Sequence, residues 1–148
     1  IDILVNNAGC NVRKPAVDVE WEDWNLVVDT NLRGGFFVAQ AVAKKMIPKR
    51  YGRIINIGSV LSLVGMEDRA SYCASKGAVL QLTRTLALEV AQDGITVNCI
   101  CPGPIETNIN AEIPDEHKVI FAKRRVPRQC QRVDGHGASA SIETMLRE

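Results

Sequence analysis

The 148-residue chain predicts an α/β fold built on a parallel sheet. Three short apolar runs, at residues 1–5, 54–57 and 95–101, have the length of buried strands. Two amphipathic stretches, at residues 20–49 and 73–91, separate them. Strands that alternate with helices in this way form parallel sheets through right-handed crossovers. We therefore expect three parallel strands with helices covering one face of the sheet.

The first strand and helix have clear boundaries in the sequence. Asn6-Asn7-Ala8-Gly9 has the composition of a loop. Pro48 and Gly52 mark the end of the first helical stretch. Gly34-Gly35 lies inside that stretch, where each glycine costs about 1 kcal/mol relative to alanine. We expect a packing or bending reason for this pair.

The second half of the chain is divided in the same manner. Residues 60–71 predict a loop after the second strand. Gly94 is placed to end the second helix. Pro102-Gly103-Pro104 stops the third strand.

The composition is that of an ordinary globular protein, with 46% apolar and 24% charged residues, and the length suggests one domain. A net charge of +1 and an aromatic content of 5% favour neither a nucleic-acid nor an anionic membrane partner. No apolar stretch approaches the ~20 residues of a membrane helix. Without a basic-then-apolar leader, the sequence predicts a cytoplasmic protein.

The cysteines predict a reduced protein without a metal site. They are five in number and scattered: Cys10, Cys73, Cys99, Cys101 and Cys130. The C-x-C pair on the third expected strand should point to one face of the sheet. We interpret all five as small buried hydrophobic residues in a reducing compartment. No ligand pair has the spacing of a metal site.

Tyr72 and Lys76 are the most informative residues for function. In a helix, residues four apart share one face. A close ammonium favours the phenolate and lowers the tyrosine pKa from its ordinary value of ~10. Such a pair can give or take a proton near neutral pH, as the interconversion of an alcohol and a carbonyl requires.

Further motifs turn this pair into a family resemblance. Asn6-Asn7-Ala8-Gly9 follows the first strand, Asn31 lies in Asp29-Thr30-Asn31-Leu32, and Ser59 precedes Tyr72 by thirteen positions. The run from Cys101 to Thr107 follows the Tyr/Lys pair. In order and spacing, these motifs resemble the classical short-chain dehydrogenase/reductases from residue 1 to about residue 110. A lone Tyr-x-x-x-Lys is weak evidence, whereas several motifs in the same order are strong.

The resemblance implies a partial Rossmann-like, doubly wound sheet over residues 1–126. Residues 127–148 then form a divergent carboxyl-terminal tail, where apolar periodicity is lost as in disordered segments. The glycine-rich pyrophosphate loop T-G-x-x-x-G-x-G does not occur in the sequence. We expect an internal piece of a longer enzyme, with a tail that comes from a reading-frame error.

The resemblance also assigns catalytic roles. Tyr72 is the acid/base, and Lys76 lowers its pKa and holds the nicotinamide ribose. Ser59 hydrogen-bonds the substrate oxygen. Asn31 bends its helix and holds a water that links the lysine to solvent. The alternatives are an ordinary helix tyrosine, a solvated lysine, a plain loop hydroxyl and a purely structural asparagine.

The implied cofactor is NAD or NADP, since the residues that distinguish the two lie in motifs absent from this sequence. The loop after the first strand would contact the adenosine part, and the Pro-Gly segment would close over the nicotinamide, with Thr107 at its carboxamide. A strand-end turn is the structural alternative for both segments. The expected cofactor-binding residues are Asn6, Ala8, Gly9, Tyr72, Lys76, Pro102, Gly103, Ile105 and Thr107.

The implied activity is NAD(P)-dependent interconversion of a secondary alcohol and a ketone. The substrate would be a sugar acid, a polyol or a 3-oxoacyl compound. A catalytically silent fragment or binding module is one alternative. An epimerase or dehydratase of the extended branch is another, although the Asn-Asn-Ala-Gly loop and the Pro-Gly segment favour the classical branch. Residues 24–49 and 73–91 resemble helices that pair between subunits, so we expect a homodimer or homotetramer for the full-length protein.

Overall fold

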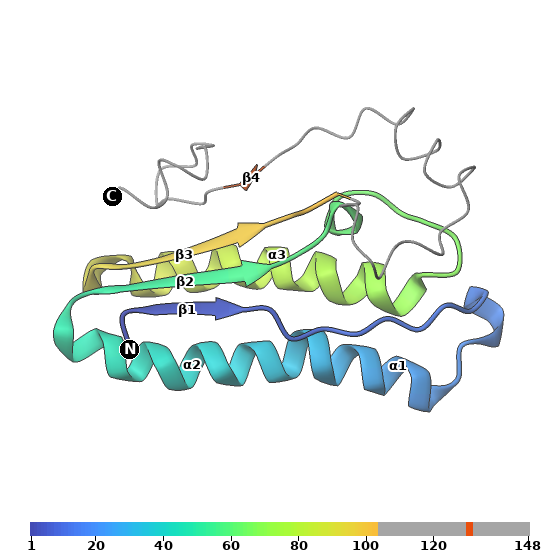
Figure 1. Cartoon of the computed structure of the whole chain (residues 1–148), viewed down its shortest axis with the longest axis horizontal. Coiled ribbons are helices and arrows are strands. Elements are labelled where there is room, and N and C mark those ends of the chain that lie inside the picture. The colour runs from blue at the N-terminus through green and yellow to red at the C-terminus, as the bar shows by residue number, and fades with distance from the viewer. Residues whose placement is uncertain (104–129, 132–148) are drawn as a thin grey trace, which may run out of the picture.

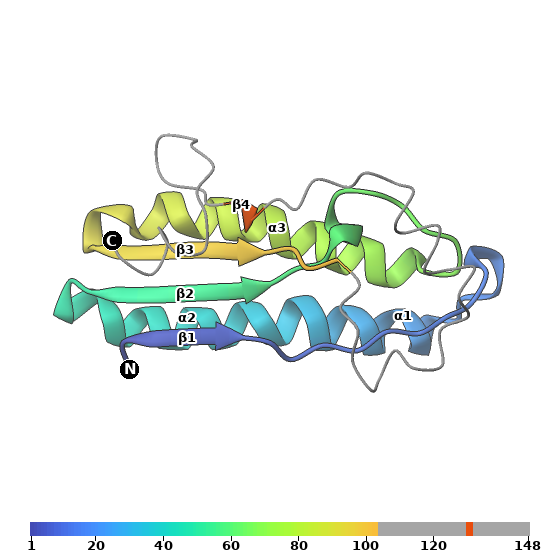
Figure 2. The same cartoon turned by 45° about the horizontal axis from the view of Figure 1, so that its top comes forward.

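The computed structural model describes residues 1–103 and 130–131, and in these ranges one sheet carries all the strands. Strands β1 (Ile3–Asn6), β2 (Gly52–Ile57) and β3 (Ile95–Ile100) are parallel and adjacent in that order. Figure 2 shows them side by side and pointing the same way. The predicted α/β fold with three parallel strands is confirmed.

A fourth strand, β4 (Cys130–Gln131), pairs antiparallel with Cys99 and Ile100 of β3. This strand was not predicted, because residues 127–148 lack an apolar strand pattern. Its pairing is made by backbone groups, which require no such pattern in the side chains. The proposed boundary at residue 126 itself lies outside the described residues.

The helices cover one face of this sheet, as predicted (Figure 1). The stretch expected as one helix over residues 20–49 consists of α1 (Trp21–Val28), the π-helical η2 (Asp29–Gly34) and α2 (Gly35–Met46). Helix α3 (Ala70–Val90) follows β2.

Short 3-10 segments complete the described elements: η1 (Ala16–Asp18), η3 (Ile47–Lys49), η4 (Val60–Ser62) and η5 (Ala91–Asp93). After η3 the chain turns at Arg50, whose φ of 51° is left-handed. Its guanidinium donates to the Gln92 carbonyl oxygen at 2.8 Å, which holds this turn against η5. Gly94 ends η5 with a φ of 70°, as predicted.

The prediction of a loop over residues 60–71 is wrong at both ends. Residues Val60–Ser62 form η4, and α3 begins at Ala70. The Ser59 hydroxyl accepts a hydrogen bond from the Leu61 N–H, and the Ser59 N–H donates to Ser62 Oγ. This reciprocal capping favours a helical turn directly after the strand.

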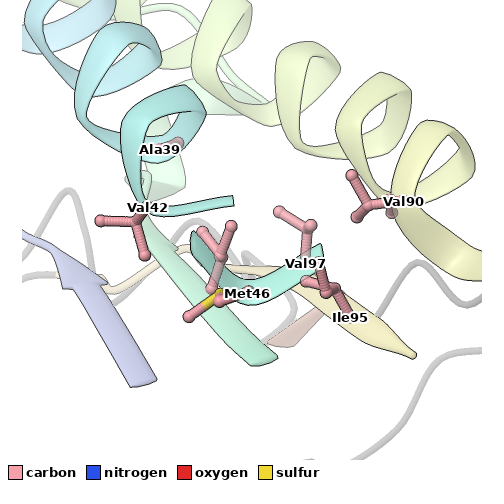
Figure 3. Close-up of a cluster of buried hydrophobic side chains, with 8 residues drawn as sticks. Ala39, Val42, Met46, Val90, Ile95 and Val97 are labelled. Carbon is pink, nitrogen blue, oxygen red and sulfur yellow. The ribbon is translucent and has the colours of Figure 1, made fainter. Parts of the chain in front are cut away.

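The apolar core lies between the sheet and the pair α2 and α3 (Figure 3). Met46 on α2, Ile54 on β2 and Val97 on β3 are at most 1% exposed. On the other face of β1, Ile3 and Val5 are more than half exposed. The strand alternation therefore divides a core face from a face that no described helix covers.

Gly35 has the packing reason that the sequence led us to expect. A Cβ atom on it would lie 3.3 Å from the Asn6 side-chain nitrogen, tighter than an ordinary contact. The residue thus lets α2 approach β1 closely.

None of the helices in the described ranges has the length and apolar character needed to cross a bilayer.

Candidate active site

Several of the predicted catalytic and cofactor-binding residues lie where the parallel strands end. The loop after β1 carries Gly9, β2 leads through Ile57 to Ser59, and the first turns of α3 carry Tyr72 and Lys76. In open α/β sheets, ligands bind at the carboxyl ends of the strands.

Lys76 is the most constrained of these residues. Its side chain is 5% exposed, and Nζ donates to the Ile57 carbonyl oxygen at 2.7 Å. Burial lowers the pKa of Lys76, and the neighbouring Cys99, Cys101 and Cys10 oppose this shift. A buried lysine on a helix is therefore tied to the end of a strand.

Tyr72 lies on the same side of α3 as Lys76, so the predicted shared face is confirmed. Lys76 Nζ is 5.7 Å from the centre of the Tyr72 ring. Tyr72 is only partly buried, which leaves the phenol open to a ligand. The structure thus places a phenol and an ammonium together at the strand ends.

Asn31 lies in the π-helical segment and is 4% exposed. Its Oδ1 accepts from the Cys10 N–H at 2.8 Å, and its Nδ2 donates to the Cys10 carbonyl oxygen at 2.9 Å and to Ser75 Oγ at 3.0 Å. One amide therefore ties the loop after β1 to helix α3. The π-helical turn departs from regular helix at Asn31, where the resemblance implied a bend.

Ser75 joins Asn31 to the first turn of α3, a contact that was not predicted from the sequence. It accepts from Asn31, and its hydroxyl donates to the Tyr72 carbonyl oxygen at 2.8 Å. The signal available in the sequence was a small polar residue directly before Lys76. Its partner lies 44 positions away, so the contact could not be predicted from local spacing.

Ser59 follows β2 and is 8% exposed. Its hydroxyl accepts from the Leu61 N–H at 3.1 Å, which leaves its own O–H free to donate to a ligand. Ser62, the nearby alternative serine, accepts from the Ser59 N–H. Ser62 thus supports Ser59.

Asn6 takes a structural position within the fold. Its Nδ2 donates to the Gly35 carbonyl oxygen at 2.8 Å and to Asn56 Oδ1 at 3.2 Å. The Asn56 amide in turn donates to Thr83 Oγ1 at 2.9 Å. This row of polar side chains joins β1, β2 and α3. Both amide hydrogens of Asn6 are therefore used within the protein.

The other expected cofactor residues fall into two groups. Ala8 and Gly9 are exposed in the loop after β1, and a Cβ on Gly9 would lie 3.5 Å from Lys76 Nζ. The Pro102 carbonyl oxygen accepts from the Val60 N–H at 2.8 Å, and Gly103 is exposed. Ile105 and Thr107 lie outside the described residues.

This donor set fits the ribose end of a nicotinamide cofactor. An ammonium has three N–H donors, and the Ile57 carbonyl uses one of those of Lys76. Gly9 presents no side chain beside that ammonium, which leaves room for a sugar hydroxyl. The pyrophosphate end has no corresponding glycine-rich loop in this sequence.

Comparison with known proteins agrees with this geometry. The family model for short chain dehydrogenases matches residues 1–118. The 3-oxoacyl-[acyl-carrier-protein] reductase of Rickettsia bellii is 41% identical over 128 residues, which cover 86% of this chain and 53% of the relative.

Two solved structures show the same likeness. The putative gluconate dehydrogenase of Agrobacterium tumefaciens has a TM-score of 0.80 and 42% identity, covering 84% of this chain and 51% of that one. The gluconate 5-dehydrogenase of Burkholderia cenocepacia, solved with NADP and tartrate, has a TM-score of 0.72 and 47% identity, covering 75% and 44%.

The chain belongs to the short-chain dehydrogenase family. These proteins are oxidoreductases that act on CH–OH groups with NAD or NADP, and matching structures were solved with NADP or with NADH. The chain spans about half the length of the relatives that it matches.

Proposed function

We propose that this chain carries the catalytic half of an NAD(P)-dependent oxidoreductase that interconverts a secondary alcohol and a ketone. The placement of Lys76 supports the proposal most directly. Burying an ammonium at the end of β2 costs free energy. Its position 5.7 Å from the centre of a partly exposed phenol ring is typical of a functional site.

Tyr72 is proposed as the general acid in the reductive direction. Its phenol donates a proton to the carbonyl oxygen of the substrate, and the positive charge of Lys76 stabilises the negative charge that develops on the phenolic oxygen. The free O–H of Ser59 donates to the same substrate oxygen and stabilises the charge forming there. Asn31 and Ser75 hold the first turn of α3 in place for this step.

NAD or NADP supplies the hydride when bound. Lys76 is proposed to hold the ribose hydroxyls with the two donors that Ile57 leaves free, and Gly9 leaves space for them. Ala8, Pro102, Gly103, Ile105 and Thr107 remain proposed contacts. For Asn6, we favour a role in holding the fold over direct contact with the cofactor, because both of its amide hydrogens are already bonded inside the protein.

The proposed substrates are sugar acids, polyols and 3-oxoacyl compounds. The Rickettsia relative acts on a 3-oxoacyl group by its name, and two of the similar structures are gluconate dehydrogenases by theirs. A panel of 3-oxoacyl thioesters and keto sugar acids, followed through the absorbance of the reduced nicotinamide, distinguishes these classes.

The test places this chain in a complete enzyme. The matched segment of the Rickettsia reductase is replaced by the corresponding residues of this chain, and turnover is measured with and without Tyr72→Phe. We expect the unsubstituted chimera to turn over and Tyr72→Phe to lower kcat by about 10²–10⁴-fold, since it removes the proton donor. The 148-residue chain by itself should bind cofactor weakly, because it contains no glycine-rich loop.

Tyr51→Phe is the matched control, because this exposed tyrosine lies just before β2 and contacts Arg53 through its ring. The control should keep its turnover. If the folded chimera binds NADP and the Tyr72→Phe substitution does not lower its activity, the proposal is contradicted. A chimera that binds cofactor and reduces no member of the panel would leave the silent binding module as the better reading.

A further inference from the structure

Two thiols lie in contact at the end of β3, beside the candidate site. Cys99 is fully buried and Cys101 is half-buried, and their sulfur atoms are 3.8 Å apart. The expectation that both point to one face of the sheet is confirmed. A Cβ on Gly58 would lie 2.9 Å from each sulfur, so both thiols occupy the space that this glycine leaves open.

The surroundings make the two thiols chemically different. Hydrogen bonding with Cys99 lowers the pKa of Cys101 to about 6, with further contributions from the Ser62 hydroxyl, the Ser59 N–H and the Lys76 ammonium, against the opposing effect of burial. The same hydrogen bond and burial raise the pKa of Cys99 above that of an ordinary thiol. Cys101 is thus the thiolate of the pair, and Cys99 the thiol.

Position along the strand adds a second difference. Cys99 lies within the β2–β3 ladder, opposite Asn56, and its side chain is closed to solvent. Cys101 follows the last ladder residue, Ile100, and is partly accessible. A small oxidant therefore reaches Cys101 first, and the Cys101 sulfur is the one with freedom to move.

We propose that Cys101 and Cys99 form a redox modification site, in which Cys101 reacts with hydrogen peroxide and Cys99 then closes a disulfide with it. The other described cysteines, Cys10 and Cys73, have no thiol partner among the described residues. The site does not depend on the proposed dehydrogenase activity.

The chemistry balances in two steps. The Cys101 thiolate attacks one peroxide oxygen, the O–O bond breaks, and the departing hydroxide takes a proton to become water, which leaves a sulfenic acid on Cys101. The Cys99 sulfur, losing its proton, attacks the Cys101 sulfur, and a second water departs as the S–S bond forms. The two sulfurs are oxidised together by two electrons, and the peroxide is reduced.

The geometry needs only a local adjustment. The sulfur atoms must close from 3.8 Å to about 2 Å, the length of a disulfide bond. Cys101 can supply this movement by rotating its side chain, because it lies beyond the paired part of β3. A disulfide would replace the Cys101 thiolate, whose pKa the Ser62 hydroxyl and the Lys76 ammonium lower, so oxidation would also alter the surroundings of the candidate site.

Peptide mapping of the reduced 148-residue chain tests the proposal. The chain is treated with equimolar hydrogen peroxide, remaining thiols are blocked with N-ethylmaleimide, and trypsin releases residues 85–118, which hold Cys99, Cys101 and no other cysteine. We expect this peptide to lose two hydrogen atoms and to take up no maleimide. A peptide with two maleimides, or one joined to another cysteine, would overturn the proposal.

Three variants assign the order of events. Cys99→Ala should leave a sulfenic acid on Cys101 that dimedone captures, and Cys101→Ser should abolish oxidation of the peptide at the same peroxide level. Cys73→Ser is the matched control, a half-buried cysteine outside the pair, and should form the disulfide as wild type does. Equal oxidation of Cys99 in Cys101→Ser would contradict the assigned roles, and the wild-type mapping decides the pairing even if a variant fails to fold.

Discussion

Buried polar side chains organise the candidate site at the scale of single residues. Asn31 satisfies three hydrogen-bonding groups at once, and Lys76 brings its ammonium to a strand carbonyl. Each of these contacts joins segments distant in sequence. The removal of one such side chain therefore leaves several buried groups without partners.

Asn31→Ala should lower the free energy of unfolding by roughly 1–3 kcal/mol, because the Cys10 backbone groups and Ser75 lose their partner. Urea denaturation of the two proteins measures the difference. Asn25→Ala is the control, a half-buried asparagine on α1 whose side chain makes no hydrogen bond to the described residues. Equal stability of Asn31→Ala and wild type would show that these hydrogen bonds contribute nothing net.

Cys101 should react with iodoacetamide at a rate that rises with pH to a midpoint of about 6 and then levels off. The thiolate is the reactive form, so a lowered pKa shifts the rise to lower pH than the ~8.5 of a free thiol. Labelling of residues 85–118, followed by mass spectrometry across pH, gives the midpoint. A midpoint near 8.5 would show that the neighbours of Cys101 do not stabilise its thiolate.

At the scale of elements, close approach between helices and strands depends on missing side chains. Gly52 begins β2 directly under Met46, the last residue of α2, and both are buried. A Cβ on Gly52 would lie 2.9 Å from the Met46 Cβ. The end of α2 is therefore packed against the backbone of the strand that follows it.

Gly52→Ala should destabilise the fold by about 1–3 kcal/mol, since the added methyl overpacks the contact with Met46. Gly65→Ala offers the matched control, because no atom lies within 4 Å of the Cβ position there. Thermal unfolding of both variants beside wild type measures the contrast. Equal melting temperatures for the two variants would mean that Met46 moves aside at no cost.

The elements also show where prediction from sequence succeeds and where it stops. The spacing of apolar residues and the positions of glycines predicted β1, β2, β3 and α3. The four-residue spacing of Tyr72 and Lys76 predicted that they share one face of a helix. The π-helical turn at Asn31 was not predictable, because Cys10 and Ser75 hold it through contacts distant in sequence. The η4 turn and the contact between the two thiols likewise arise only when the ends of β2 and β3 come together.

For the molecule as a whole, several large apolar side chains remain on the outer surfaces of the helices. Trp21, Leu26 and Phe37 on the α1–α2 stretch and Leu88 on α3 are each more than half exposed. These helices resemble those that pair between subunits in the family. Exposed apolar side chains of this kind are typical of protein–protein contacts, such as the homodimer or homotetramer expected from the resemblance would need.

Phe37→Asp should therefore shift the full-length protein toward a smaller species in sedimentation velocity, because a carboxylate would be buried in the proposed interface. Val17→Asp is the control, an exposed apolar residue on the separate η1 segment. Identical sedimentation of wild type and Phe37→Asp would place the subunit contact elsewhere or show that none exists.

The polar row from Asn6 through Asn56 to Thr83 has a consequence for how the sheet assembles. If β1 slid by one position along β2 so that Val5 lay opposite Asn56, the Asn6 amide would turn outward and an apolar side chain would face Asn56 in the interior. An amide left without a partner in that interior costs free energy. These three side chains therefore favour the observed register of the first two strands over that slipped register.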